Sequence, residues 1–391
     1  MATQKGVWNI QQVRDKQLQD LWGYRNAGQL WISGGDPWSS GVTAQNDRTT
    51  ISSPKQVPGD WALNDGIGAS GNKHMGMETG VFAIKNDGTL WGWGAGGHGQ
   101  LAQNDRESYS SPVQVGSDST WKTLSLAGVN ARSVGGIKTD GTLWTWGDNS
   151  AFTLGQSTSA PADKSSPVQV PGTTWKSVLM DGKTFMGLKT DGTLWTCGRN
   201  EDGALGHNDK TQYSSPKQIP GTTWGDSFGG WDNVSAAVKT DGTLWVWGTN
   251  GNGELGLNSR NEFSSPKQVP GTTWSKINQG FGESASLGLK TDGTLWSWGM
   301  NEYGALGLNQ AHESRVSSPT QIPGTTWDNV SNSFDGVIAT KTDGTLWVWG
   351  RGTNGQLGLN SQTEYSSPVQ LPGTWEKTID AGGYTMVALK N

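Results

Sequence analysis

Apolar and polar positions alternate in short runs along the chain, which predicts β-strands rather than helices. In Leu143-Trp144-Thr145-Trp146 the two Trp fall on one side of a strand and Leu143 on the other. Asp-Gly, Pro-Gly and longer glycine-rich segments separate these runs and are signals for turns. No segment between them has the length and 3.6-residue period of a long helix. The pattern therefore predicts an all-β chain of short strands.

The strongest turn signal is the phrase Asp-Gly-Thr-Leu-Trp, which occurs six times. The copies begin at Asp87, Asp140, Asp191, Asp241, Asp292 and Asp343, 50 to 53 residues apart. Asp-Gly between two apolar runs predicts a hairpin in which both central residues have positive φ. A repeat of about fifty residues that holds about four short strands has the length of one β-propeller blade.

Two other elements recur seven times, once more than the Asp-Gly phrase. They are Ser-Ser-Pro, which predicts an outer strand because proline is tolerated at a sheet edge, and a Trp shortly after it. The prolines stand at positions 54, 112, 167, 216, 266, 319 and 368, and the Trp residues are Trp61, Trp121, Trp175, Trp224, Trp274, Trp327 and Trp375. Seven such elements predict seven blades.

The two ends of the chain supply the seventh turn. The segment "YRNAGQLWISGG" (24–35) aligns with "IKNDGTLWGWGA" (84–95), and Asn391 aligns with Asn86, where the other copies continue into their turn. We therefore predict a seven-bladed β-propeller over residues 24–391, with about four antiparallel strands in each blade. Residues 375–391 are expected to pair with residues 24–60 in one shared blade. This pairing would close the ring and remove two exposed sheet edges.

Composition and charge exclude several classes of function. The 391 residues include 59 Gly, 23 Trp and a single Cys, and the formal net charge is −5. One cysteine excludes an internal disulfide, and the negative charge argues against nucleic acid as a partner. No apolar run approaches the ~20 residues of a membrane-spanning helix, and the amino-terminal residues lack the apolar core of a secretory signal. We expect neither membrane insertion nor export.

The residues offer little support for catalysis. The four histidines, His74, His98, His207 and His312, stand in different repeats and none has metal-ligand spacing. Cys197 occupies the position of the second Trp in the "LWxW" phrase of other repeats, which predicts a packing role. The fixed recurrence of the Trp pairs likewise favours packing between blades over stacking on sugars. We expect no enzyme activity, no cofactor and no metal.

Binding specificity is expected where the repeats differ. Between the glycine-rich loop and Ser-Ser-Pro, repeats combine a basic residue with an aromatic residue just before the serines. The candidate partner-binding rim consists of Trp38, Arg106, Tyr109, Lys210, Tyr213, Arg260, Phe263, Arg315 and Tyr365. The alternative is that the aromatic residues cap the outer strand of each blade. Residues 63–80, about eight residues longer than their counterparts, form a second candidate contact element.

The repeat resembles that of a known family. The segment "KTDGTLWVWGTNGNGELGLN" (239–258) followed by "SSPKQVPG" (264–271) is similar to the repeat of the regulator of chromosome condensation family, and the resemblance runs from about residue 24 to 391. The resemblance implies a seven-bladed propeller. The family includes nucleotide-exchange factors for a small GTPase and inhibitors of β-lactamase. Here the histidine often found before the Asp-Gly turn and a basic tail are both absent, so the resemblance implies the fold and not exchange activity.

Residues 1–23 lie outside the repeats and form a leader segment. Its apolar residues fall near helical spacing. The candidate anchor consists of Trp8, Ile10, Val13, Leu18 and Leu21. The alternative is a short segment packed against the propeller. The stretch "GVWNIQQVRDKQLQDLW" (6–22) resembles amino termini of virion proteins of tailed phages.

These features favour a non-enzymatic virion protein of a tailed phage, an appendage, fibre or decoration that serves assembly or host attachment. The expected partners are other virion proteins, or a protein or glycan of the host surface. A homo-oligomer within the particle is a further expectation, and the expected location is the virion, assembled in the host cytoplasm. The alternatives are a free protein-binding propeller of inhibitor or scaffold type and a glycan-binding, lectin-like propeller.

Overall fold

The computed structural model describes most of the propeller. The described residues are 28–34, 44, 46, 51–62, 74–76, 80–127, 132–158, 162–231, 233–278, 285–333, 336–353, 357–359, 361–373, 375–382 and 385–390. Within them every regular element is a strand, apart from one 3-10 helix, η1 (Glu302–Gly304). The prediction of an all-β chain is confirmed.

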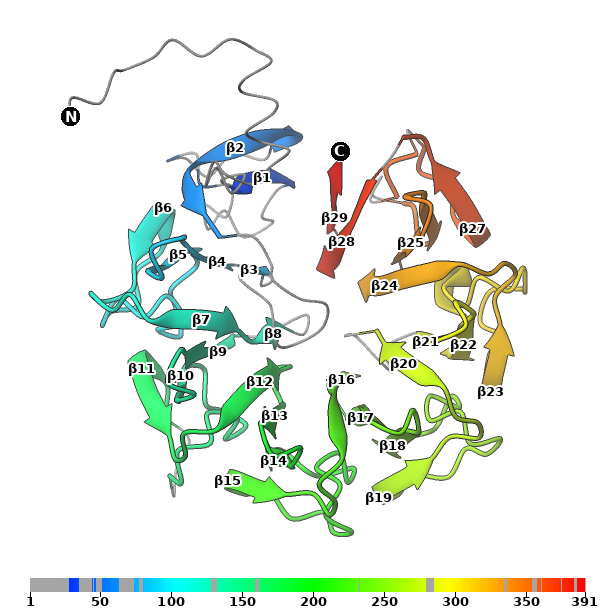
Figure 1. Cartoon of the computed structure of the whole chain (residues 1–391), viewed down its shortest axis with the longest axis horizontal. Coiled ribbons are helices and arrows are strands. Elements are labelled where there is room, and N and C mark those ends of the chain that lie inside the picture. The colour runs from blue at the N-terminus through cyan, green and yellow to red at the C-terminus, as the bar shows by residue number, and fades with distance from the viewer. Residues whose placement is uncertain are drawn as a thin grey trace, which may run out of the picture.

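Six sheets, each a meander of four antiparallel strands, follow one another around a ring (Figure 1). Blade I contains β3 (His74–Gly76), β4 (Gly80–Ile84), β5 (Leu90–Gly94) and β6 (Tyr109–Gln114). Blade II contains β7 (Trp121–Leu124), β9 (Ser133–Lys138), β10 (Leu143–Gly147) and β11 (Lys164–Val170). Blade III contains β12 (Trp175–Met180), β13 (Thr184–Lys189), β14 (Leu194–Gly198) and β15 (Tyr213–Gln218), and the short β8 (Leu126–Ala127) joins it in parallel.

The second half of the ring has the same order of strands. Blade IV contains β16 (Trp224–Trp231), β17 (Val234–Lys239), β18 (Leu244–Gly248) and β19 (Phe263–Gln268). Blade V contains β20 (Trp274–Ile277), β21 (Ala285–Lys290), β22 (Leu295–Met300) and β23 (Arg315–Gln321). Blade VI contains β24 (Trp327–Ser333), β25 (Gly336–Lys341), β26 (Leu346–Gly350) and β27 (Tyr365–Leu371). The fourth strand of each blade lies on the circumference (Figure 1).

The seventh blade is present as two halves from opposite ends of the chain. The pairs β28 (Trp375–Gly382) with β29 (Thr385–Lys390) and β1 (Gly28–Gly34) with β2 (Ile51–Trp61) occupy the sector between blades VI and I (Figure 1). Leu30 faces Val57 in the register of β10 and β11, and Trp375 faces Lys390 in the register of β12 and β13. The halves therefore match the outer and inner parts of a complete blade. The described ladders do not include one between β29 and β1, so closure by that pairing stays a prediction.

The Asp-Gly turns differ from the predicted hairpin. In blade II only the glycine has positive φ, 77° at Gly141. The N–H of Gly141 donates to the carbonyl of Lys138, and that of Lys138 donates to the carbonyl of Thr142, so the loop has three residues: a type I turn and a glycine bulge. Asp140 Oδ1 accepts the backbone N–H and the hydroxyl of Thr142 at 2.9 and 2.7 Å. Positive φ at both central residues was a wrong prediction, because the third loop residue lets glycine alone take the left-handed conformation.

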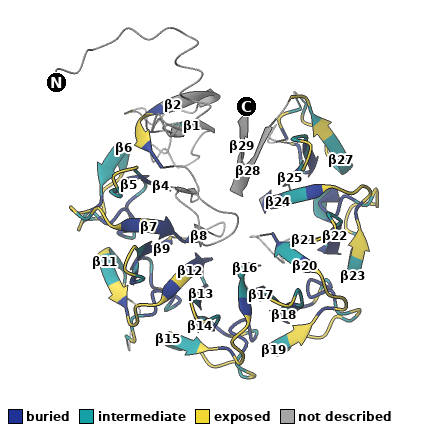
Figure 2. Cartoon of the chain, in the orientation of Figure 1, coloured by how far each residue is buried: buried dark blue, intermediate teal, exposed yellow. Residues whose placement is uncertain are grey.

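The core lies between neighbouring blades, and Figure 2 shows its buried residues inside the ring and exposed residues on the outer strands. The second Trp of each "LWxW" strand enters this core. Trp298 of blade V, for example, is completely buried in a cluster with Leu255 and Val269 of blade IV. Its Nε1 donates to the carbonyl of Glu254, also in blade IV, at 2.8 Å. Trp146, Trp247 and Trp349 donate in the same way to the carbonyls of Gln100, Ala204 and Ala305.

Blade III lacks this Trp, and its packing against the neighbouring blade uses other residues. Cys197 is completely buried, as the packing interpretation predicts, and faces Phe185 on β13. Blades IV and V have Ser235 and Ser286 opposite their Trp. Phe185 meets Trp175 edge to face with ring centroids 5.8 Å apart, the geometry of a Trp–Trp pair in the other blades. Cys197 is smaller than the Trp of the other blades, and Phe185, which faces it, fills the space that the Trp side chain would occupy.

The two Trp of each "LWxW" strand have different surroundings. The first Trp is half-buried in all six described blades, whereas the second, where present, is completely buried. A lysine at the end of the second strand lies against the first Trp and against the Trp of the inner strand. In blade V, Lys290 Nζ is 4.2 Å from the ring centroid of Trp296 and 4.8 Å from that of Trp274. The equivalent lysines are Lys85, Lys138, Lys189, Lys239 and Lys341.

Candidate functional site

The aromatic residues of the predicted rim begin the fourth strands of four blades. They are Tyr109, Tyr213, Phe263 and Tyr365, and all four are half-buried against the cores between blades. Tyr109 Oη donates to Asp105 Oδ2 at 2.8 Å, and this hydrogen bond to a carboxylate raises the pKa of Tyr109. Tyr213 Oη donates to Asp209 in the same way and accepts from Lys217 Nζ at 2.7 Å. These placements favour the capping interpretation for the aromatic residues.

The basic residues of the rim are exposed in the loops that join the third strands to the fourth. They are Arg106, Lys210, Arg260 and, at the start of β23, Arg315. Arg106 Nη2 lies 3.4 Å from Asp163 of the next blade, and Lys210 Nζ lies 3.4 Å from Glu262 of the next blade. Exposed pairs of this kind contribute at most about 1 kcal/mol to stability. Arg106 and Lys210 can therefore exchange these ion pairs for contacts outside the fold at little cost in stability.

The structure does not gather the predicted rim into one patch. Each blade carries its own residues, and the fourth strands are spread around the circumference (Figure 1). Trp38 lies outside the described residues, as do the anchor candidates Trp8, Ile10, Val13, Leu18 and Leu21. Of the candidate contact element at 63–80, the structure describes residues 74–76 and 80 only.

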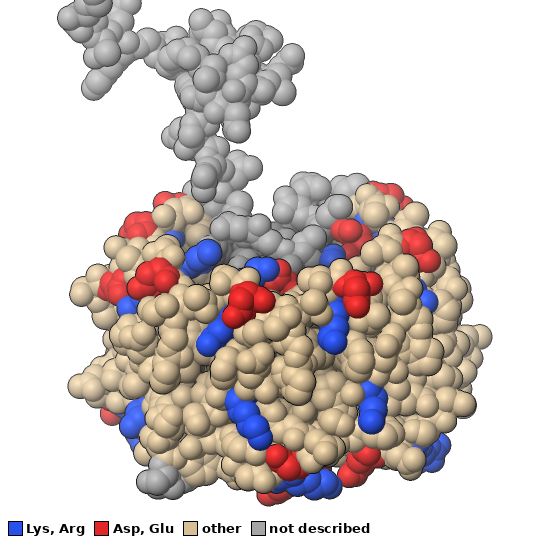
Figure 3. All heavy atoms as spheres, turned by 60° about the horizontal axis from the view of Figure 1, so that its bottom comes forward, with Lys and Arg blue, Asp and Glu red and all other residues tan. Residues whose placement is uncertain are grey.

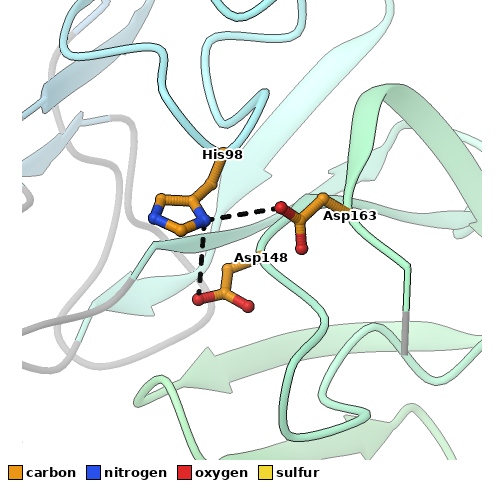
Figure 4. Close-up of side chains that lie close together, drawn as sticks. All are labelled: His98, Asp148 and Asp163. Carbon is orange, nitrogen blue, oxygen red and sulfur yellow. Dashed lines mark hydrogen bonds and ion pairs between the residues drawn. The ribbon is translucent and has the colours of Figure 1, made fainter. Parts of the chain in front are cut away.

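A cluster that the sequence does not reveal lies between the glycine-rich loops of blades I and II (Figure 4). His98 Nδ1 is 3.4 Å from Asp163 Oδ2 and 4.0 Å from Asp148 Oδ2. The three residues present ligand-type atoms within 4.8 Å of one another. Residues 98 and 163 are far apart along the chain, so no local spacing could have indicated the cluster. The absence of metal-ligand spacing in the sequence is compatible with this cluster, which forms only where the two blades meet.

The hydrogen bonds around His98 indicate which ring nitrogen carries the proton and therefore the role of the cluster. Arg132 Nη1 lies 3.2 Å from His98 Nε2, and an arginine can only donate. Nε2 therefore accepts, and the imidazole proton sits on Nδ1, which donates toward Asp163. A protonated Nδ1 is not a metal ligand. Arg132 lies beside the imidazole and Arg106 beside Asp163, so the cluster is a polar bridge between neighbouring blades.

Other titratable groups in blade III do not form a catalytic set. Burial raises the pKa of the Cys197 thiol, which removes it as a nucleophile. Burial, together with the nearby charge of Lys217, lowers the pKa of His207 to about 4. His207 Nε2 lies 2.9 Å from the hydroxyl of Thr196, a residue that is itself buried and donates to a backbone carbonyl. Both groups are part of the packing.

Antiparallel blades of about fifty residues, with Asp-Gly-Thr-Leu-Trp turns and inter-blade Trp, define a repeat-built β-propeller. The family model described as "Regulator of chromosome condensation (RCC1) repeat" matches residues 87–127, 191–232, 241–279, 292–331 and 343–389. These matches cover more than half of the chain. The chain belongs to the RCC1 repeat family.

Similarity to individual proteins is lower and partial. Human E3 ubiquitin-protein ligase HERC2 is 26% identical over 315 residues, which are 78% of this chain and 5% of that protein. The regulator of chromosome condensation of Xenopus laevis is 37% identical over 93 residues, 24% of this chain and 22% of that protein. The matched part is thus a small share of the length of these curated relatives.

Solved structures show the same fold. The alignment with human WBSCR16 has a TM-score of 0.75 at 18% identity and covers 93% of this chain and 100% of that one. Prp20p from Saccharomyces cerevisiae gives 0.71 at 17% identity, with 93% and 92% covered. At these identities the likeness concerns the fold alone. Within the described residues, no helix has the length and apolar character required to span a membrane.

Proposed function

We propose that this chain is a non-enzymatic, protein-binding propeller, and that the loops between the third and fourth strands make its contacts. The observation that carries the proposal is that residues common to all blades and residues that differ between blades lie in different parts of the fold. The Trp, Lys, Asp and Thr that recur in each blade are used in packing and in turns. Exposed side chains that differ between blades, such as Glu107, Thr211 and Asn261, lie in these loops beside the basic residues Arg106, Lys210 and Arg260.

The charge distribution supports a protein partner. Basic and acidic side chains are interspersed over the side of the ring seen in Figure 3. A nucleic-acid site requires a continuous basic field along the phosphate backbone, whereas protein surfaces pair charges of both signs. The published description of Prp20p names Gsp1p and histones as molecules it binds, and we extend only the class of partner, a protein, to this chain.

We further propose that the partner is a component of a tailed-phage virion, in which the propeller serves as an appendage, fibre or decoration for assembly or host attachment. This step is supported by the residues at 6–22, which resemble the openings of such virion proteins, and by the apolar anchor candidates within them. The segment would dock on the particle together with the loops, so that loss of either contact prevents stable incorporation.

Mass spectrometry of purified particles tests the virion role. The chain should be found in particles at a constant ratio to the major structural proteins, and its absence would remove the virion role. Deleting residues 1–21 gives a second readout, because a propeller that folds should then fail to enter particles. Normal incorporation of that variant would show that the leader is no anchor.

The second candidate is a free inhibitor or scaffold propeller, which the same loops would serve. It predicts a soluble complex with a host protein and no association with particles. Detecting the chain in particles therefore decides between the two.

A further inference from the structure

We propose that the loop between β14 and β15 of blade III, residues 199–212, is an acid-sensitive latch that stays closed while His207 is neutral and opens when this histidine takes up a proton. The loop carries Lys210 and Thr211, two of the exposed residues to which the proposed function assigns partner contacts. The inference thus concerns the regulation of that site and rests on the proposed function for its biological meaning. The latch itself is a property of the free chain.

His207 stands where three other blades have an apolar residue. The equivalent positions of blades IV, V and VI hold Leu257, Leu308 and Leu359, and these leucines are partly buried against hydrophobic cores. The imidazole of His207 occupies the same position and is half-buried. A leucine has no charge at any pH, whereas a histidine titrates near neutral pH. Blade III therefore places an ionisable group beneath its loop.

The hydrogen bonds of the ring determine which nitrogen takes up the proton. Thr196 Oγ1 donates to the carbonyl of Leu205 at 2.7 Å, so its single proton is already used. His207 Nε2 lies 2.9 Å from the same Oγ1 and must therefore donate to it. Gln156 of blade II makes the same donation to its own threonine, Thr145, at 3.1 Å. In the neutral ring Nε2 thus carries the proton, and Nδ1 is the nitrogen that becomes protonated in acid.

Three parts of blade III face the ring. β14 contributes the uncharged Thr196, β15 contributes Tyr213 and Lys217, and the loop contributes Asp209. The rings of His207 and Tyr213 meet edge to face with centroids 5.4 Å apart. Lys217 Nζ donates to Tyr213 Oη at 2.7 Å and lies 3.6 Å from Asp209 Oδ2, which also accepts from Tyr213 Oη at 2.8 Å. The Asp209 carboxylate is therefore already shared between two neighbours.

These surroundings oppose protonation of the ring. Burial, followed by the charge of Lys217, lowers the pKa of His207 to about 4 from its ordinary value of 6.5. The attraction of Asp209 acts in the opposite direction and is smaller. A ring that leaves its half-buried place regains its ordinary pKa. The closed loop is therefore unaffected above about pH 6.5 and is increasingly disfavoured as the pH falls from there to about 4.

The loop is joined to blade IV beside His207. The N–H of Asn208, the next residue, donates to the carbonyl of Ser264 on β19 at 2.7 Å. Lys210 Nζ lies 3.4 Å from Glu262 Oε2, an exposed pair that contributes little to stability. The loop of blade IV makes the same backbone bond to blade V. The bond is thus common to both loops, and the residue before it decides whether the loop responds to acid.

Opening of the latch changes one partner-binding loop and leaves the others in place. When the ring of His207 moves out, Asn208 moves with it, the bond to Ser264 is lost, and Lys210 and Thr211 leave their positions. The loops of blades IV, V and VI have leucine at the position of the histidine and stay closed. A partner that contacts several blades therefore loses its contact at blade III first.

Hydrogen–deuterium exchange of the full chain at about pH 7.5 and about pH 5, corrected for intrinsic exchange rates, tests the latch. The amides that report on it are those of Leu205 and Asn208, which donate to Asn200 Oδ1 and to the Ser264 carbonyl. We expect their protection to fall roughly tenfold or more at about pH 5, because this pH lies well below the ordinary pKa of histidine.

The same loop of blade IV is an internal control in this experiment. Its Leu255 and Asn258 amides make the equivalent hydrogen bonds, to Asn250 Oδ1 and to the carbonyl of Ser317, and should keep their protection at both pH values. Equal losses in the two blades would overturn the proposal, because acid would then loosen the loops in general. Unchanged protection in both blades would overturn it as well.

Matched variants assign the effect to one side chain. His207→Leu, the residue type of blades IV to VI, should remove the pH dependence, and so should His207→Gln, the type of blades I and II. His312→Gln alters an exposed histidine of blade V and should retain it. Persistence of the pH dependence in both His207 variants would overturn the proposal. Melting temperatures at about pH 7.5 establish that the variants fold.

An NMR titration of the unaltered chain requires no variant. Of its four histidines, at least one should titrate below about pH 5, and titration of all four near about pH 6.5 would overturn the proposal. The latch and the proposed function fail separately in these experiments. Absence of the chain from particles removes the virion role and leaves the latch, whereas a blade III loop that is insensitive to acid removes the latch and leaves the proposed contacts.

Discussion

The interior of the ring and its loops come from the same repeat, yet the interior residues are nearly constant between blades and the loop residues differ. Between blades, the second Trp of the "LWxW" strand is completely buried, and in four described blades it donates to a carbonyl of the preceding blade. In the loops, equivalent positions hold exposed residues of different kinds, such as Glu107, Thr211 and Asn261. Replacing a close-packed ring opens a cavity, whereas replacing a side chain in water costs little. The comparison shows where this ring can acquire a partner without changing its fold.

The contact between blades II and III shows how the interior can change. There Cys197 replaces Trp, Phe185 faces it, and Phe152 stands where blades III and IV have Gly203 and Gly253. Phe152 retains the positive φ of those glycines, at 60°. The interior at this contact therefore changes by several residues together.

The largest expected effect follows from opening the ring. Removing residues 386–391 deletes most of β29 and leaves the predicted shared blade without its second strand. We expect the whole propeller to lose more than about 4 kcal/mol of stability, because both halves of the blade would present unpaired edges. Calorimetry and size-exclusion chromatography measure this loss. An unchanged melting temperature would contradict closure of the ring by the two ends, and deletion of residues 1–21 is the matched control expected to melt normally.

The next largest effect is expected inside the ring. Trp298→Ala should cost about 3–5 kcal/mol in unfolding free energy, because it opens a cavity and removes the bond to Glu254. Trp296→Ala, at the half-buried position two residues away, should cost clearly less. Urea unfolding of both variants makes the comparison. Equal losses would show that the two Trp of the strand are not distinguished by burial.

A smaller change in stability is expected at the contact of Cys197 with Phe185 in blade III. Cys197→Trp should destabilise the chain by about 1–3 kcal/mol, because Phe185 already fills the space opposite. Adding Phe185→Ser, the residue type of blades IV and V, should recover part of this loss. A double-mutant cycle measures the coupling between the two positions. Strict additivity would mean that Phe185 does not compensate for Cys197.

The pH dependence of Asp118 gives a still smaller effect. Its folded pKa of about 2 lies below the ordinary value of 3.8, chiefly because of the Lys138 hydrogen bond. The stabilisation is therefore complete above about pH 4 and is lost as the pH falls through about 2. Asp118→Asn should be less stable than the unaltered chain at pH 7, and this difference should shrink between pH 4 and pH 2.5. Urea unfolding at each pH measures the difference, and a constant value would contradict the assignment.

The repeat made most of the fold predictable. Six copies of Asp-Gly-Thr-Leu-Trp and seven of Ser-Ser-Pro predict the number and order of strands. Alignment of the repeats also places Cys197 at the position of the second Trp. The turn geometry was not predictable, because Asp140 accepts hydrogen bonds from Thr142 in a three-residue loop. The lysine between two Trp rings was missed, although its fixed position before each Asp-Gly was a visible signal.

The candidate sites were less predictable, because they depend on contacts between blades. His98 meets Asp148 and Asp163 only through the packing of blade I on blade II. The ion pair of Asp118 with Lys138 likewise joins the turn that follows blade I to a strand of blade II. The sequence of a single repeat therefore does not indicate that these residues belong to a site. The turn Gly-Ser-Asp-Ser-Thr at 116–120, where blades III to VI are preceded by Pro-Gly-Thr-Thr, was a local indication that this contact differs from the others.

The most direct test of the central claim, that the variable loops make the partner contacts, is a comparison of two triple variants in particle incorporation. One carries Arg106→Glu, Lys210→Glu and Arg260→Glu in the loops. The other carries Thr173→Glu, Thr222→Glu and Thr272→Glu, which are exposed in the turns between blades. Both should fold, because an exposed substitution changes stability by only about 0.5 kcal/mol, and loss of the Arg106–Asp163 pair adds at most about 1 kcal/mol. The account predicts that the loop variant is lost from particles and the turn variant is retained; retention of the loop variant with loss of the turn variant would contradict it.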